Sequence, residues 1–203
     1  MISQDWKVDF DVLEKYLQRG LSSGLGSVDN QVCVEQAVCL ALGLEPTDNP
    51  PCTDPVLRRY KVELNDKSWS SPEARAKGMR ALAYAQIGTR DNLTANKWVS
   101  RLAELTIRVL LPELGTQCGY PRDLCLRCAE EGTTKAALAF REHAYAANAA
   151  YAAAYAAAAA AANAADKYLT LSANLALRAL QEQGFGVDQE EVPLDLLFKL
   201  GEE

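Results

Sequence analysis

Cys33 combines a nucleophilic side chain with a setting that favours its ionised form. It follows a glycine-rich loop over residues 20–30, and the sequence predicts that it lies one turn inside the next helix. Backbone N–H groups and the helix macrodipole lower the pKa of a thiol in such a position. Cysteine is also a common small apolar residue of helix cores. The sequence therefore leaves a packing role, which we favour, beside the hypothesis of a catalytic thiolate.

A catalytic thiolate would need a base, and His143 is the only histidine of the chain. The order Gln31 then Cys33 resembles papain-like cysteine hydrolases over a handful of residues. That resemblance implies an oxyanion-hole role for Gln31 and a histidine base, which such enzymes usually carry on a strand. His143 instead lies in an alanine-rich segment that reads as helix. A hydrolase using Cys33 and His143 is thus an alternative function, and we favour a protein that is not an enzyme.

Cys118, Cys125 and Cys128 are a second candidate group. Two thiols three residues apart have the spacing of a zinc-binding pair, and Cys52 or His143 could supply a further ligand. A zinc ribbon needs a second close pair, which the sequence lacks, and thiols at this spacing also share one face of a helix. We expect core cysteines, no bound metal and no cofactor, with a structural zinc or a local disulfide as alternatives.

Basic side chains near one tryptophan form a third candidate group. They could bind a phosphate-bearing ligand such as a nucleotide, although solvated helix faces are the common explanation of such charges. The candidate ligand-binding residues are Arg58, Arg59, Trp69, Arg75 and Arg80. The net charge is −6, from 21 basic and 27 acidic side chains, so we expect no duplex nucleic acid as a partner.

The elements that must position these residues all read as helices, which predicts an all-α fold. No segment alternates apolar and polar residues as a half-buried strand does. Ser70 or Ser71 is expected to cap one helix, and Pro112 with Gly115 is expected to end another. The predicted helices cover residues 5–19, 30–42, 56–60, 71–87, 94–111 and 121–131.

Residues 133–183 contain neither glycine nor proline and include a long alanine tract. One helix of this length would measure ~76 Å, against ~43 Å across a compact domain of this size. It must project, be covered by a second chain, or bend back near residues 163–166. Alanine faces let backbones approach closely, so we predict a homo-oligomer whose interface includes Tyr145, Tyr151 and Tyr155. Whether this segment is one continuous helix stays open.

Two further expectations concern domain organisation and location. We expect a globular helical domain over residues 1–132, joined to residues 133–203, a long alanine-rich helix with a short docking helix near the C-terminus, as one cooperative unit. The uncharged stretch 144–165 is long enough for a bilayer, but alanine and two asparagines make it a poor span, so we expect no membrane partner. Six cysteines without a visible secretory signal favour reduced thiols and a cytoplasmic location.

Several short runs together resemble an uncharacterised family of hypothetical proteins from bacterial, phage and metagenomic sequence. The family brings no established activity, so the resemblance implies no functional residue, only a mobile-element protein acting inside a bacterium. The runs that carry it are Cys33–Cys39, Asn49–Cys52, Leu64–Asp66, Trp69–Arg75, the Ala/Tyr-rich tract and Asp166–Leu169.

These observations favour a non-enzymatic interaction protein, homo-oligomeric through its alanine-rich helix, with a protein or a small anionic ligand as its partner. A phage-type inhibitor or a ligand-sequestering protein fits this class. A nucleotide-binding or other anion-binding domain and the Cys33 hydrolase are the alternatives.

Overall fold

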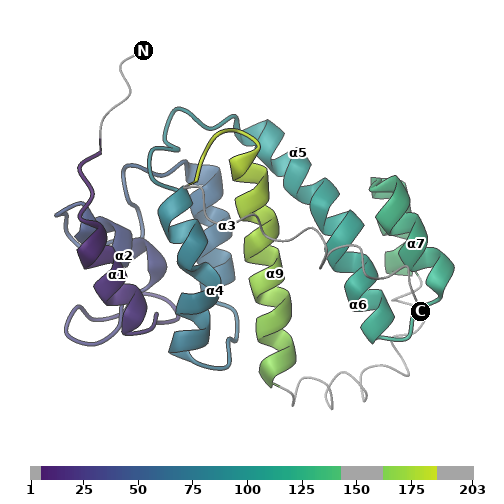
Figure 1. The fold of residues 1–203 in the computed structure, drawn as a ribbon, viewed down its shortest axis with the longest axis horizontal. Helices are drawn as coiled ribbons and strands as arrows, with labels where there is room; N and C mark the ends of the chain where they lie inside the picture. The colour runs from purple at the N-terminus through teal and green to yellow at the C-terminus, as the bar shows by residue number, and fades with distance from the viewer. Residues whose placement is uncertain (1–5, 143–161, 187–203) are drawn as a thin grey trace. The chain divides into compact units, whose positions relative to one another are not determined.

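A computed structural model describes residues 6–142 and 162–186, and every regular element in them is a helix, which confirms the all-α fold (Figure 1). A single parallel β-bridge in the described chain joins Leu21 to Val32. The helices in chain order are α1 (Phe10–Gln18), α2 (Val34–Ala41), α3 (Pro55–Asn65), α4 (Pro72–Ala85), α5 (Ala95–Leu105), the π-helix η1 (Thr106–Leu110), α6 (Leu111–Gln117), α7 (Arg122–Glu131) and α9 (Ala162–Gln181).

The chain folds into two compact units, which differ from the predicted division at residue 132. Unit 1 takes its described residues from Met1–Trp98 and Ala161–Val187, and unit 2 takes them from Val99–Ala160. The difference arises because α9 packs along α4 and so returns the C-terminal part of the chain to unit 1. The buried side of α9 is rich in alanine and leucine, which suits close helix packing.

Polar contacts fix α9 within unit 1. The Tyr60 hydroxyl donates to the backbone oxygen of Ser172 at 2.9 Å, and Trp98 Nε1 donates to that of Ala176 at 3.2 Å. The two rings meet edge to face, with centroids 5.6 Å apart, and Trp98 is almost fully buried. These bonds satisfy the polar ends of two large aromatic side chains inside the core.

Three helices of unit 1 begin at the side chains expected of helix N-caps. Asp9 accepts from the N–H groups of the second and third residues of α1, and Asp54 does the same for α3. Ser71 accepts from the N–H of Ala74, and Pro72 occupies the first position of α4. The Ser71 cap is therefore confirmed. Helix α3 runs well beyond the predicted residues 56–60, because its buried side continues to Asn65.

The predicted start of α2 near Asn30 is wrong. Residues 27–31 close a turn, in which Ser27 N–H donates to the oxygen of Gln31 at 2.8 Å. Helix α2 begins only at Val34, and Cys33 is its N-cap. The turn uses the backbone groups that a longer helix would have needed, so Cys33 lies at the helix start and not one turn inside it.

In unit 2 the helix predicted to end at Pro112 and Gly115 continues through both residues. Proline has no N–H, and its ring crowds the carbonyl one turn earlier. The π-helix Thr106–Leu110 lies directly before Pro112 and widens the backbone there. At Gly115 a Cβ atom would lie 2.7 Å from Cys125 Sγ, so glycine lets α6 and α7 approach. The predicted helix end at residue 131 is confirmed, and Gly132, with a left-handed φ of 63°, follows it as the C-cap of α7.

Only part of the segment 133–183 is described. Residues 134–142 are helical, and so is α9. The open question of one continuous helix and the predicted docking helix near the C-terminus both concern residues outside the described ranges, as does the predicted interface of Tyr145, Tyr151 and Tyr155.

Gly78 permits the contact between α4, α9 and Trp69. A Cβ atom there would lie 2.4 Å from the Trp69 ring and 3.0 Å from Thr170 Oγ1. We expect Gly78→Ala to lower the free energy of unfolding by about 1–2 kcal/mol, because overpacking outweighs the ~1 kcal/mol gain in helix propensity. Urea denaturation measures this, with Lys77→Ala as the exposed control on the same helix. Equal or greater stability of the Gly78 variant would contradict the packing described here.

A candidate ligand cavity

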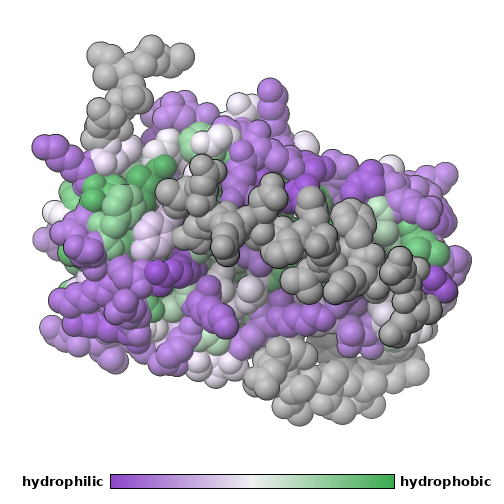
Figure 2. Space-filling view, in the orientation of Figure 1, coloured by the Kyte–Doolittle hydropathy of each residue, from purple (hydrophilic) through white to green (hydrophobic). Residues whose placement is uncertain are grey.

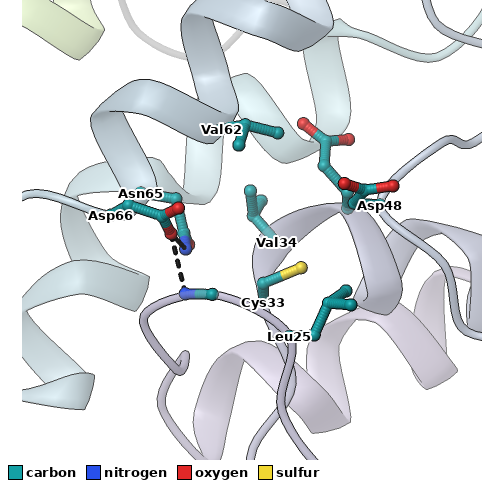
Figure 3. Close-up of a pocket in the computed structure, with 9 residues that line it drawn as sticks. Leu25, Cys33, Val34, Asp48, Val62, Asn65 and Asp66 are labelled. Carbon is teal, nitrogen blue, oxygen red and sulfur yellow. Dashed lines mark hydrogen bonds between the residues drawn. The ribbon is translucent and has the colours of Figure 1, made fainter.

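A cavity of about 170 Å³ lies in unit 1 between the loop that precedes α2, the start of α2 and the C-terminal half of α3 (Figure 3). Figure 3 shows Asn65 and Asp66 on one side of it and Asp48 on the other. Three of its lining residues, Leu25, Asp48 and Asp66, are exposed, whereas Cys33, Val34, Glu35 and Asn65 are buried. The complete lining is Gly24, Leu25, Cys33, Val34, Glu35, Asp48, Val62, Asn65 and Asp66. We call this space the Glu35 cavity.

Gln36 holds the loop side of the Glu35 cavity. Its Oε1 accepts from the N–H groups of Gly26 at 2.9 Å and Cys33 at 3.1 Å, and its Nε2 donates to the oxygen of Pro46 at 3.3 Å. Gly26 is required there, because a Cβ atom would lie 1.9 Å from the oxygen of Gln31. One buried amide thus joins two loops to the start of α2.

Arg75 joins the two walls of the Glu35 cavity. It donates from Nη1 to the oxygen of Leu21 at 2.6 Å and from Nε to the oxygen of Asn65 at 2.8 Å. Asp66 adds a direct link, because its Oδ1 accepts from the N–H of Gly24 at 2.7 Å (Figure 3). The loop and the end of α3 are therefore fixed relative to each other by hydrogen bonds to charged groups.

Glu35 and Lys61 form an ion pair with no exposed surface on either side chain. Glu35 Oε1 lies 3.1 Å from Lys61 Nζ. Burial raises the pKa of Glu35 while the neighbouring Lys61 opposes that shift, and burial lowers the pKa of Lys61 while Glu35 opposes it. Of the two residues only Glu35 lines the cavity.

Two polar side chains of the cavity carry acceptors without a hydrogen-bond partner among the described residues. They are Glu35, whose carboxylate is held by the ion pair with Lys61, and Asn65, whose Oδ1 is unpartnered. The Asn65 amide nitrogen is fully used, since it donates to the oxygen of Ser22 at 3.0 Å and to Asp66 Oδ1 at 2.9 Å. Buried acceptors are nearly always paired, so Asn65 Oδ1 and the Glu35 oxygen that does not pair with Lys61 are open to donors from water or from a ligand.

Cys33 lines the cavity, but its surroundings do not activate it. Burial raises the pKa of the thiol, and the nearby Glu35 carboxylate adds to that effect. The N–H groups of Gln36 and Glu35 lower the pKa without overcoming burial. The expectation that the helix start lowers the pKa of this thiol is therefore wrong. Burial raises the pKa by more than the N–H groups at the helix start lower it. The proposed base, His143, lies outside the described residues.

The arginines predicted to bind an anion have separate partners. Arg58 lies 4.0 Å from Asp48, Arg59 pairs with Glu63 at 3.2 Å, and Arg80 pairs with Glu14 at 2.6 Å. Arg75 holds backbone oxygens, as described above. Trp69 is buried and donates from Nε1 to the oxygen of Leu64 at 3.0 Å. In the described residues these five side chains therefore do not form one anion site.

A second hollow lies over the start of α1, where Figure 2 shows apolar surface on the α1–α2 side of unit 1. Its volume is about 890 Å³, and it is lined by residues 6–11 and 41–43. None of these residues has a buried polar side-chain atom without a hydrogen-bond partner. This open groove therefore lacks the unmet hydrogen-bonding demand of the Glu35 cavity.

Comparison of the chain with protein-family models, with curated proteins and with solved structures gives no match.

The cysteine cluster of unit 2 lies in an apolar core. Cys125 and Cys128 are buried with Ala136 and Phe140, and Cys118 is half-buried. All six cysteines of the chain are free thiols. Across residues 6–142 and 162–186 no three histidine, cysteine, aspartate or glutamate side chains lie close enough to hold a metal ion. In the same ranges, no helix has both the length and the apolar character needed to cross a bilayer.

Glu35, Asn65 and the buried pairing of Lys61 are the features of the site that sequence reasoning missed. Lys61 lies four residues after Leu57 and three before Leu64, which places a charge on the apolar side of α3. Glu35 is the only charge between Val32 and Leu44. The sequence signal for this buried ion pair was that Lys61 and Glu35 each place one charge within an apolar pattern.

Proposed function

We propose that unit 1 binds a small organic molecule in the Glu35 cavity. The supporting observation is that buried acceptors on Glu35 and Asn65, which lack hydrogen-bond partners among the described residues, line one cavity. An unpaired buried acceptor costs about 1–3 kcal/mol, and a ligand that donates to it recovers that free energy. Concave sites with apolar walls and a few convergent polar groups are the usual form of small-molecule sites.

Binding without chemistry is the activity that this site supports best. Catalysis by Cys33 would need the thiolate, and the raised pKa of this thiol favours its protonated form. A nucleotide is also a poor fit, since the pockets that bind drug-sized ligands measure about 300–1,000 Å³. The cavity is smaller, at about 170 Å³, and three carboxylates line it. A ligand-sequestering or ligand-sensing protein therefore agrees better with the site than an anion-binding one.

Oligomer formation through the alanine-rich segment is an independent proposal. It depends on Tyr145, Tyr151 and Tyr155, which lie outside the described residues, so it stays a prediction. Native mass spectrometry tests it without reference to the cavity. A cytoplasmic location and a role as a phage-type inhibitor likewise stay predictions from the sequence.

A cavity-blocking variant tests ligand binding. Leu25 is 67% exposed and lines the cavity, so Leu25→Trp should narrow the entrance with little effect on stability. We expect small fragments, screened by amide chemical shifts of the full chain, to perturb residues 24–35 and 62–66, and to bind Leu25→Trp at least tenfold more weakly. Leu44→Trp is the matched control, because Leu44 is 43% exposed and is not part of the lining. Fragments that bind both variants equally, or a screen without hits, would overturn the proposal.

A further inference from the structure

We infer that the Glu35 cavity recognises an organic cation with N–H donors, an ammonium or guanidinium group on a short apolar chain. This inference rests on the proposed binding function and names the ligand class. It follows from the charge of the lining, from its hydrogen-bonding state, and from its size and walls.

The lining is acidic. Glu35, Asp48 and Asp66 contribute three carboxylates, and none of the nine lining residues is lysine or arginine. Two cations lie behind this surface, Lys61 beside Glu35 and Arg58 beside Asp48. The charge of a third cation, Arg75, interacts with that of Asp66, which also accepts from Gly24 N–H and Asn65, so the excess of carboxylates is confined to the surface of the cavity itself. Such a lining attracts a cation and disfavours an anion.

The hydrogen-bonding groups of the lining also favour a cation with N–H donors. The Asn65 amide nitrogen and the Gly24 N–H already donate to protein oxygens. The N–H groups of Glu35 and Gln36 face the Cys33 sulfur. The acceptors left over belong to Glu35 and Asn65. A ligand must therefore bring donors, and ammonium and guanidinium groups have donors and no acceptors.

Size and apolar contacts limit the rest of the ligand. A volume of about 170 Å³ equals that of five or six waters, at roughly 30 Å³ each in the liquid. Leu25, Val34 and Val62 provide apolar contacts beside the carboxylates. A chain of about four carbons with one cationic end satisfies both conditions. A free amine has this chemistry, and so does a lysine or arginine side chain of a peptide.

Calorimetry with ligands of matched size tests the inference on the full chain at pH 7. The probes are n-butylammonium, n-butylguanidinium, 1-butanol and butyrate. We expect at least one of the cations to bind at least tenfold more tightly than butanol, and butyrate not to bind. One outcome is that butanol or butyrate binds as tightly as the better cation and still binds Leu25→Trp more weakly. This would overturn the ligand class and leave the proposed binding function standing. Absence of binding by all four, together with a fragment screen without hits, would overturn both.

Two variants separate the cavity from general surface charge. Leu25→Lys supplies an internal cation at the entrance, so we expect the affinity for the preferred cation to fall at least tenfold. Leu44→Lys adds the same charge at an exposed position outside the cavity lining and should change the affinity for that cation less than twofold. Equal effects of the two lysines would contradict recognition in the cavity. A blocked Ala-Lys-Ala tripeptide distinguishes the source of the cation, since tighter binding than n-butylammonium indicates a peptide and weaker binding indicates a free amine.

Discussion

Lys61→Met is expected to lower the free energy of unfolding by about 3–5 kcal/mol at pH 7, because it leaves the Glu35 carboxylate buried without its cation. Neither side chain has exposed surface, so bulk water does not replace the lost partner. Chemical denaturation of the variant and the unchanged protein measures the difference. A loss below about 1 kcal/mol would show that Lys61 does not compensate a buried charge.

The same variant should depend on pH in a defined direction. Burial raises the pKa of Glu35 in the folded state, and Lys61 is the main group that opposes this shift. Without Lys61 the folded protein takes up a proton at a higher pH than the unfolded chain does. The stability linked to Glu35 is then full below the unfolded pKa and is lost as pH rises through the folded pKa. The loss in free energy of unfolding of Lys61→Met relative to the unchanged protein should therefore be larger at pH 8 than at pH 5.

Replacing both partners provides the control. Glu35→Met with Lys61→Met removes the two charges together and keeps similar side-chain volumes, so we expect most of the lost stability to return. This double variant should also lose the preferred cation as a ligand, because no buried carboxylate remains in the cavity. A folded double variant that binds that cation unchanged would separate the buried pair from ligand recognition.

Arg75→Met is expected to cost about 3 kcal/mol of stability, since hydrogen bonds from a charged donor contribute ~1.5–3 kcal/mol each. The substitution leaves the backbone oxygens of Leu21 and Asn65 without the donors that Arg75 gives them. It should also weaken fragment binding, because those two bonds join the walls of the Glu35 cavity. Thermal and chemical denaturation, followed by the fragment screen, measure both effects.

Arg59→Met is the matched control for Arg75. The Arg59 side chain is 82% exposed, and among the described residues it pairs with Glu63, one turn along α3. Exposed pairs of this kind contribute about 0.3–0.5 kcal/mol, so its loss should be small. If Arg75 instead served the anion site expected from the sequence, Arg75→Met would abolish binding of inorganic phosphate and leave stability nearly unchanged.

Helices were predictable wherever local signals determine them. Ser71 before Pro72 and Gly132 after Glu131 act within one turn of the helix that they delimit, and both predictions are confirmed. Errors occurred where distant contacts decide. The start of α2 depends on a turn held by Gln36, and the continuation past Gly115 depends on contact with Cys125 and Phe140.

The site was less predictable than the fold, because its chemistry comes from residues far apart in sequence. Arginine is a common anion-binding residue type, so the sequence could suggest that role for Arg75. Only the folded chain shows that its guanidinium donates hydrogen bonds to backbone oxygens. Lys61 and Glu35 each break an apolar pattern, but the sequence does not state that they face each other. Cys33 lines the Glu35 cavity, but burial raises the pKa of its thiol, which does not support the nucleophile considered from the sequence.

A crystal structure of the full-length protein soaked with n-butylguanidinium would test the central claim most directly. The account predicts density for the ligand in the Glu35 cavity, with its N–H groups within hydrogen-bond distance of Glu35 Oε2 and Asn65 Oδ1 and its alkyl chain against Val62. Ordered water alone on these two oxygens, at a ligand concentration that saturates binding in solution, would contradict it.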